Sequence, residues 1–341
     1  APSSSYSLPV AASWEVDITG KILNNKRSAQ SSYEQSRLYR QSVQTSLISA
    51  IANSYYTLLM LDKQLELVSD METLTKDTWE TMKVLIDSRR GYRSVSVQAA
   101  ESNYYSVLTK KADLKRQIRE TENTLSLLLG EQAQTIARGK IEAQSLPTSF
   151  STGVGVQLLN NRADVHAAEM ALAQCFYGVE TARSRFYPSI TISGTGAFTN
   201  SSGAGIVNPG KWLLSAVGSL VQPIFQNGRL IAGLRVAKAQ YEQAYNTWQN
   251  AVLKAGSEVS NALVLYNSSE EKSQIEAKQI EVLQKNVEQT RELVGDAGSN
   301  YLDIITAQSS LLNVQLSKVA DDFNKMQAVV NLYYALGGGA K

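Results

Sequence analysis

This sequence of 341 residues has almost none of the residues from which disulfides and common metal sites are built. It contains one cysteine, Cys175, and one histidine, His166. A single cysteine cannot close an intrachain disulfide, and one cysteine with one histidine cannot supply the usual ligands of a zinc ion. Both residues lie in a helical pattern, where packing or surface roles are more common than nucleophile and base. We therefore expect no catalytic residue, no cofactor site and no metal site.

A strong charge of one sign and a long apolar run are also missing. The 33 basic and 31 acidic residues give a formal net charge of +2, which is too little for a nucleic-acid-binding domain. No stretch reaches the 18 apolar residues that indicate a membrane-spanning helix. With 43% hydrophobic and 19% charged residues, the chain does not have the composition of a disordered protein.

Proline is absent from Lys21 to Glu131, and this gap favours long helices. Apolar residues recur there at alternating steps of three and four, as at Leu58, Leu61 and Leu65, which is a heptad seam. The pattern predicts a helix over 24–88 that, at a rise of ~1.5 Å per residue, is roughly 100 Å long. Helices of this length are typical of coiled coils or helical barrels.

Four more helices follow from the same reasoning. They are expected over 95–129, 160–186, 230–294 and 301–336.

Three stretches alternate apolar and polar residues, the third less cleanly than the other two, as strands with one apolar and one wet face do. The stretches are 5–19, 189–199 and 212–226. About eleven residues at ~3.3 Å each, tilted by ~40°, cover about 28 Å, which matches the apolar band of an outer-membrane barrel. Lipid permits spanning strands only in a closed barrel, and three strands cannot close one. Several chains would therefore have to share one barrel.

The two halves of the chain repeat each other. The triplet Tyr-Glu-Gln at 33–35 returns at 241–243, an offset of 208. Three glycine pairs match at offsets of 207 or 208, namely Gly20 with Gly228, Gly91 with Gly298, and Gly130 with Gly337. We expect a first repeat over 1–130, a connection over 131–157 and a second repeat over 158–341.

Several segments in this order resemble the TolC family of outer-membrane efflux proteins, and more closely its multidrug-pump branch. They are ASWEVDITGK (12–21), LLNNRADVHAAEMALAQ (158–174), ARSRFYPSITISGTGAF (182–198), SLVQPIFQNGR (219–229), GSNYLDIITAQSSLLNVQ (298–315) and YYALGGG (333–339). The sequence departs from the family at Ala163, where proline is usual, and at Thr306, where a second acid is common.

The resemblance implies a mainly α fold with a small β part and an internal duplication. Long helical hairpins of three chains would form an α-barrel in the periplasm, and four strands per chain would form a shared β-barrel in the outer membrane of a Gram-negative bacterium. The partners implied are two further copies of the chain, a periplasmic adaptor, an inner-membrane pump and outer-membrane lipid.

The implied function is a passive exit duct of a tripartite efflux system for small toxic compounds or drugs. Two alternatives stay open. One is a duct for type I protein secretion. The other is a structural coiled-coil protein whose strands never meet lipid.

The resemblance places the pore constriction at Asp303, where three copies would form an anionic ring. Thr306 stands where paired-acid relatives carry a second carboxylate, so the ring would be less acidic. The alternative for Asp303 is an acid that stabilises a helix N-terminus.

The two turns between the long helices are expected to gate the duct or contact the adaptor. Their residues are Arg89, Arg90, Gly91 and Arg93 in the first turn and Gly298 and Tyr301 in the second. Ordinary solvated turns would explain the same residues. On the first strand, Glu15 and Asp17 would face a wet lumen. Since that strand has no preceding partner, we expect that an earlier helix and strand are missing and that residues 1–20 are poorly placed or paired irregularly.

Overall fold

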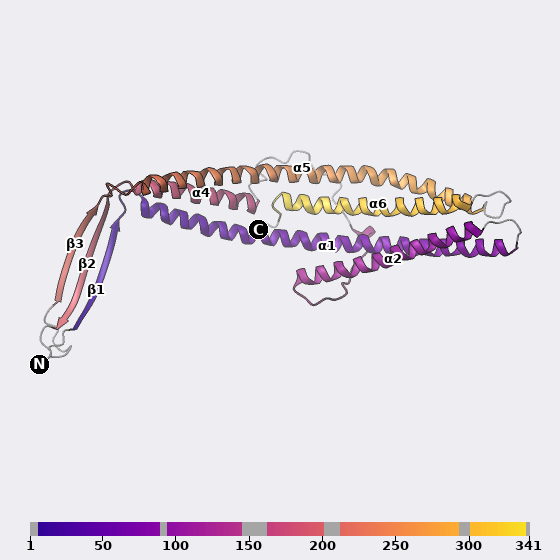
Figure 1. The fold of residues 1–341 in the computed structure, drawn as a ribbon, viewed down its shortest axis with the longest axis horizontal. Coiled ribbons are helices and arrows are strands. Elements are labelled where there is room, and N and C mark those ends of the chain that lie inside the picture. Colours follow the sequence, from indigo (N-terminus) through magenta and orange to yellow (C-terminus); the bar gives the residue numbers. More distant parts are fainter. Residues whose placement is uncertain (1–5, 89–93, 145–161, 201–211, 293–300, 339–341) are drawn as a thin grey trace. The chain divides into compact units, whose positions relative to one another are not determined.

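The computed structural model describes residues 6–88, 94–144, 162–200, 212–292 and 301–338 (Figure 1). It divides into two compact units, one made of 1–40 with 163–253 and the other of 41–162 with 254–341. Each unit therefore takes segments from both predicted repeats, and the repeat boundaries stay a prediction about the sequence.

Across the described ranges, no helix combines the length and the apolarity needed to cross a membrane.

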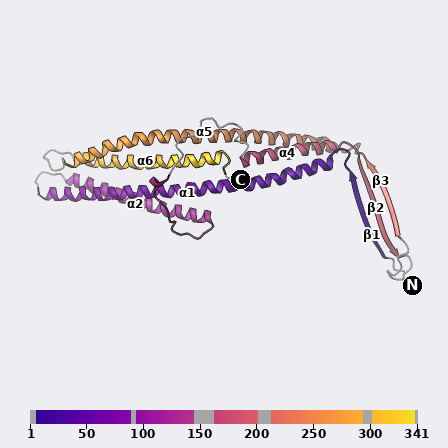
Figure 2. The same ribbon diagram turned by 180° about the vertical axis from the view of Figure 1, so that it is seen from behind.

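The first unit contains an antiparallel sheet of order β1-β2-β3, visible in both views (Figures 1 and 2). Its strands are β1 (Tyr6–Val16), β2 (Ser189–Asn200) and β3 (Trp212–Val221). Trp14 lies opposite Ile192, which in turn lies opposite Gly218, so the apolar positions of β1 and β2 share one face with the even-numbered residues of β3. On the other face, the Thr195 and Ser215 hydroxyls are 2.7 Å apart and hydrogen-bonded. The alternation in the sequence therefore predicted the two faces of β1 and β2 correctly, whereas β3 also places Val217 and Val221 on the second face.

The strands differ from the prediction in their pairing and in where two of them end. β1 pairs with β2 in one unbroken register from Tyr6 to Val16, so the expectation of irregular pairing is wrong for this stretch. β1 also ends before Asp17, whose carboxylate binds the next helix. β3 ends at Val221 and not at residue 226, and Pro223, which follows two residues later, has no amide hydrogen to donate to a ladder.

The helices confirm the heptad reading. Those described are α1 (Lys21–Ser88), α2 (Ser94–Leu129), α4 (Ala163–Ser184), α5 (Arg229–Glu292), α6 (Tyr301–Ala335) and the short η1 (Ile141–Ala143). The α4 helix ends two residues early because Phe186 and Tyr187 close a tight turn onto Arg183 and Ser184. Pro188 then prevents a return to helix.

The second unit is held by the predicted heptad positions. Leu58, Leu61 and Val68 of α1 are at most 3% exposed and belong to one apolar cluster. The same cluster contains α2 residues such as Leu114 and α6 residues such as Leu312. One continuous core therefore fixes α1, α2 and α6 within this unit.

The backbone supports the internal duplication. Among the described glycines, the four with positive φ form the two matched pairs, at 73° and 77° for Gly20 and Gly228 and at 74° and 75° for Gly130 and Gly337. The hydrogen bond from Gly130 N to Leu127 O recurs from Gly337 N to Tyr334 O, 207 residues later. Each repeat thus ends its second helix with the same left-handed glycine cap. The third pair, Gly91 and Gly298, lies outside the described residues.

Candidate functional site

The predicted constriction lies at the start of α6. Asp303 is exposed in the first turn of the helix, where a carboxylate also interacts favourably with the helix dipole. Thr306, one turn further, is exposed, and its hydroxyl donates to the Leu302 carbonyl at 2.7 Å. Thr306 carries no charge, so Asp303 is the acidic side chain of this turn.

Most of the predicted turn residues fall outside the described part of the chain. These are Arg89, Arg90, Gly91, Arg93 and Gly298. Tyr301 begins α6, but its side chain is outside the described atoms. Their gating or adaptor role stays a prediction.

Glu15 and Asp17 sit at the junction between β1 and α1. The Lys21 ammonium donates to the Glu15 carboxylate at 2.8 Å. Asp17 accepts from the backbone amides of Ile22 at 3.1 Å and Leu23 at 2.8 Å. Asp17 therefore satisfies first-turn amides of α1, a role that the strand reading missed.

Replacing Asp17 with alanine is expected to weaken the first turn of α1 by about 1 kcal/mol, because two amides lose their acceptor. Hydrogen exchange at Ile22 and Leu23 should then accelerate about fivefold. Asp17→Asn is the control, since asparagine accepts similar bonds without the charge. Equal exchange in all three proteins would refute the capping role.

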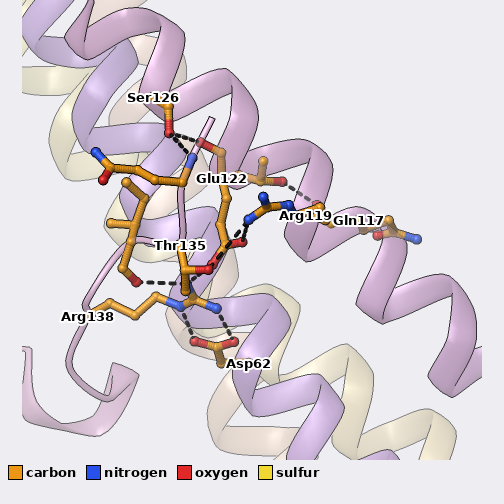
Figure 3. A network of polar contacts seen from close by, with 10 residues as sticks. Asp62, Gln117, Arg119, Glu122, Ser126, Thr135 and Arg138 are labelled. Atoms are coloured by element: carbon orange, nitrogen blue, oxygen red, sulfur yellow. Dashed lines mark hydrogen bonds and ion pairs between the residues drawn. The ribbon is translucent and has the colours of Figure 1, made fainter. Parts of the chain in front are cut away.

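A partly buried ionic network connects the segment after α2 to the helices of the second unit (Figure 3). Arg138 contacts the Asp62 carboxylate of α1 through two nitrogens, one of them at 2.8 Å, and donates to Glu122 of α2 at 2.6 Å. The Glu122 side chain is only 5% exposed and also accepts from Arg119 at 3.2 Å. Arg138 thus ties the segment from Ile136 to η1 onto both helices.

The network sets the charge of Glu122. Burial alone would raise the pKa of the Glu122 carboxyl, but the bonds from Arg138 and Arg119 outweigh it and hold the pKa below the ordinary 4.5. The Arg138 pKa is raised, foremost by the hydrogen bond to Asp62. Both side chains therefore stay ionised at neutral pH.

Another arginine, Arg162, is buried and precedes α4 in the chain. Its side chain is 3% exposed and donates to Glu258 of α5 at 2.7 Å. It also donates to the carbonyl of Ala335, the last residue of α6, at 3.4 Å, and its guanidinium lies 5.4 Å from the Tyr334 ring centre. Arg162 thus joins the end of α6 to the middle of α5.

These ion pairs connect segments of the second unit that are far apart in the sequence. In the portion of the chain that the structure describes, no three histidine, cysteine, aspartate or glutamate side chains gather as metal ligands. Sequence reasoning missed Arg138 and Arg162, whose partners are distant in sequence, and Gln308, whose amide is fully buried in α6. Only Gln308 had a visible signal, as one amide within the apolar pattern Ile304-Ile305-Thr306-Ala307-Gln308-Ser309-Ser310-Leu311.

The chain is similar to known proteins over nearly its whole length. It is 25% identical over 342 residues to the cation efflux system protein CusC of Escherichia coli K12, covering 98% of this chain and 73% of CusC. It is 28% identical over 355 residues to the pyoverdine export outer membrane protein OpmQ of Pseudomonas putida, covering 99% and 71%.

The fold is shared with a solved channel. The open-state crystal structure of the MtrE outer membrane channel of Neisseria gonorrhoeae superposes with a TM-score of 0.89 at 24% identity, covering 99% of this chain and 77% of that chain.

The family described as outer membrane efflux protein matches residues 1–131 and 154–338, which include every long helix and strand described above. The chain therefore belongs to the outer membrane efflux protein family.

Proposed function

We propose that three copies of this chain form a passive, gated exit duct through the outer membrane for small toxic compounds. The observation that carries the proposal is the family match, which spans the amphipathic sheet and all the long helices. The sheet has one apolar face along β1, β2 and β3, as a lipid-facing wall requires. The long helices, which carry heptad seams, are suited to packing side by side as a periplasmic tube.

The cargo class rests on the resemblance alone. The names of two relatives specify cations for CusC and pyoverdine for OpmQ, so relatives of similar identity serve different cargoes. A duct that accepts what its pump delivers accounts for this range. We place the energy source and the choice of cargo in an inner-membrane pump, with a periplasmic adaptor that docks at the turns between the long helices.

Conductance of the purified protein in planar lipid bilayers tests the duct. The expected result is discrete conductance steps, with a trimer in sedimentation of the detergent-solubilised protein. A protein that neither enters lipid nor conducts would favour the coiled-coil alternative. Conductance together with passage of unfolded polypeptide would favour secretion.

We place the narrowest point of the duct at Asp303. Adding a second carboxylate one turn away, by Thr306→Asp, should raise the cation-over-anion permeability ratio. Each unit charge acts on a passing ion with about 1 kcal/mol at ~4 Å in water, and three chains add three such charges, so the expected rise is at least about fivefold. Reversal-potential measurements across a salt gradient give this ratio.

Two further variants complete that experiment. Asp303→Asn should lower the permeability ratio, whereas Thr306→Ser keeps the hydroxyl and should leave it unchanged. If neither Thr306→Asp nor Asp303→Asn changes the permeability ratio, the constriction lies elsewhere.

A further inference from the structure

One buried amide interrupts the apolar face of α6 close to Asp303. Gln308 is 0% exposed, and its neighbours on the same face, Ile304, Ala307 and Leu312, are buried as well. The Gln308 Nε2 atom donates to the Thr78 hydroxyl of α1 at 2.8 Å, and this hydroxyl donates in turn to the Leu74 carbonyl at 2.9 Å. The bond joins residues 230 positions apart in the sequence.

The amide is only half satisfied. Within the part of the chain that the structure describes, the buried Gln308 Oε1 atom has no hydrogen-bond partner. The same holds for the buried Nε1 of Trp79, the residue next to Thr78, whose ring stacks on Tyr104 of α2 at 5.6 Å. A buried acceptor without a partner destabilises the packed state, so apolar packing alone does not explain a glutamine here.

Two neighbouring contacts continue the polar connection along α6. Ser309 donates to Asn103 of α2 at 3.3 Å, and Lys110 of α2 donates to Asn313 at 3.4 Å. These polar side chains lie beside an otherwise apolar contact between helices. In coiled coils, a single polar residue in an apolar seam selects one axial register at the expense of stability.

We propose that Gln308 is a positioning residue for the pore, whose bond to Thr78 fixes the register of α6 against the α1/α2 hairpin. Asp303 lies five residues before Gln308, about 7.5 Å along the helix at ~1.5 Å per residue. The register selected by Gln308 therefore sets the position of Asp303 along the axis of α6, relative to α1 and α2. This inference rests on the proposed function for its effect on conduction, but the register itself is measurable without conduction.

The first test reads the register directly. In a Cys175→Ser background, Asn103→Cys with Ser309→Cys replaces a hydrogen-bonded pair and should form a disulfide. Asn103→Cys with Asn313→Cys reports α6 shifted by one helical turn. Adding Gln308→Leu should raise the yield of the 103–313 disulfide about fivefold, since the register loses one net hydrogen bond. An unchanged yield would overturn the proposal, whether or not the protein conducts.

The second test reads the pore. Gln308→Leu and Thr78→Val should each turn one conductance level into several, and the double variant should resemble either single variant because both remove the same bond. Thr78→Ser keeps the hydroxyl and should keep one level. A merely structural role would instead lower the melting temperature and leave a single level.

Stability separates these readings further. Gln308→Leu removes a buried acceptor without a partner, so its melting temperature should equal or exceed that of the unmodified protein. One conductance level in both Gln308→Leu and Thr78→Val would overturn the proposal and leave the duct intact. Absence of conductance in the unmodified protein would instead refute the duct, and the disulfide yields would still decide the register.

Discussion

Replacing Arg138 with methionine is expected to lower the free energy of unfolding of the second unit by about 3 kcal/mol. Methionine keeps much of the volume of the side chain but leaves Glu122, which is 5% exposed, with Arg119 as its remaining ionic partner in Figure 3. A carboxylate buried this deeply loses far more when a partner is removed than a surface pair would. Thermal or denaturant unfolding of the purified protein measures the loss.

Arg116 provides a matched control on α2, the helix that carries Glu122. Its guanidinium donates to Glu120 at 2.8 Å, similar to the 2.6 Å from Arg138 to Glu122. Its side chain is 57% exposed, however, and that of Glu120 is 61% exposed. Arg116→Met should therefore leave the stability nearly unchanged, because an exposed ion pair contributes little. Equal losses in the two variants would show that burial does not determine the strength of the network.

The pH dependence gives the Arg138 prediction an independent sign. The Glu122 pKa is lowered in the folded protein, so its stabilisation is present above 4.5 and is lost as the pH falls through the folded value. In Arg138→Met, burial is opposed by fewer hydrogen bonds, and the Glu122 pKa should rise. Protonation then relieves the variant, so the stability gap to the unmodified protein should narrow between pH 7 and pH 4. A gap that widens on acidification would contradict this assignment.

The sequence was sufficient for the periodic part of the fold. Heptad spacing depends only on local chain geometry, and it located α1, α2, α5 and α6 within a few residues. Alternation likewise predicted the faces of β1 and β2. The errors fell at element ends, where one side chain such as that of Asp17 decides between strand and cap. A polar residue next to a strand looks the same in the sequence whether it continues the strand or caps the next helix.

The buried polar contacts could not be predicted in the same way. Arg138 and Asp62 are 76 residues apart, and nothing periodic connects them. Asp303 was predicted only through family resemblance, because an acid in a first turn is common in any helix. Gln308 shows the intermediate case. Its position in an apolar stripe was visible, but its partner Thr78 was identified only when α1 and α6 were placed together.

Replacing Arg162 with alanine is expected to destabilise the second unit by about 3–4 kcal/mol, because the change acts at three contacts at once. It removes the bond to Glu258 and leaves a cavity where a side chain only 3% exposed had packed. It also removes the donor to the Ala335 carbonyl at the end of α6 and the cation that faces the Tyr334 ring. Unfolding experiments should show the loss, and hydrogen exchange should locate it at the last turn of α6.

Two companion variants separate volume from charge at this site. Arg162→Met retains most of the packing, so whatever stability it recovers over Arg162→Ala measures the filled volume, and the remaining deficit measures the ionic and capping contacts. Lys254→Met is the control, since Lys254 is 72% exposed and approaches the same Glu258 carboxylate at 3.9 Å. It should cost less than about 0.5 kcal/mol. If Arg162→Ala costs no more than this control, the buried guanidinium does not hold α6 to α5, and the end of α6 must be anchored by its apolar contacts with α5 around Val259 and Leu332.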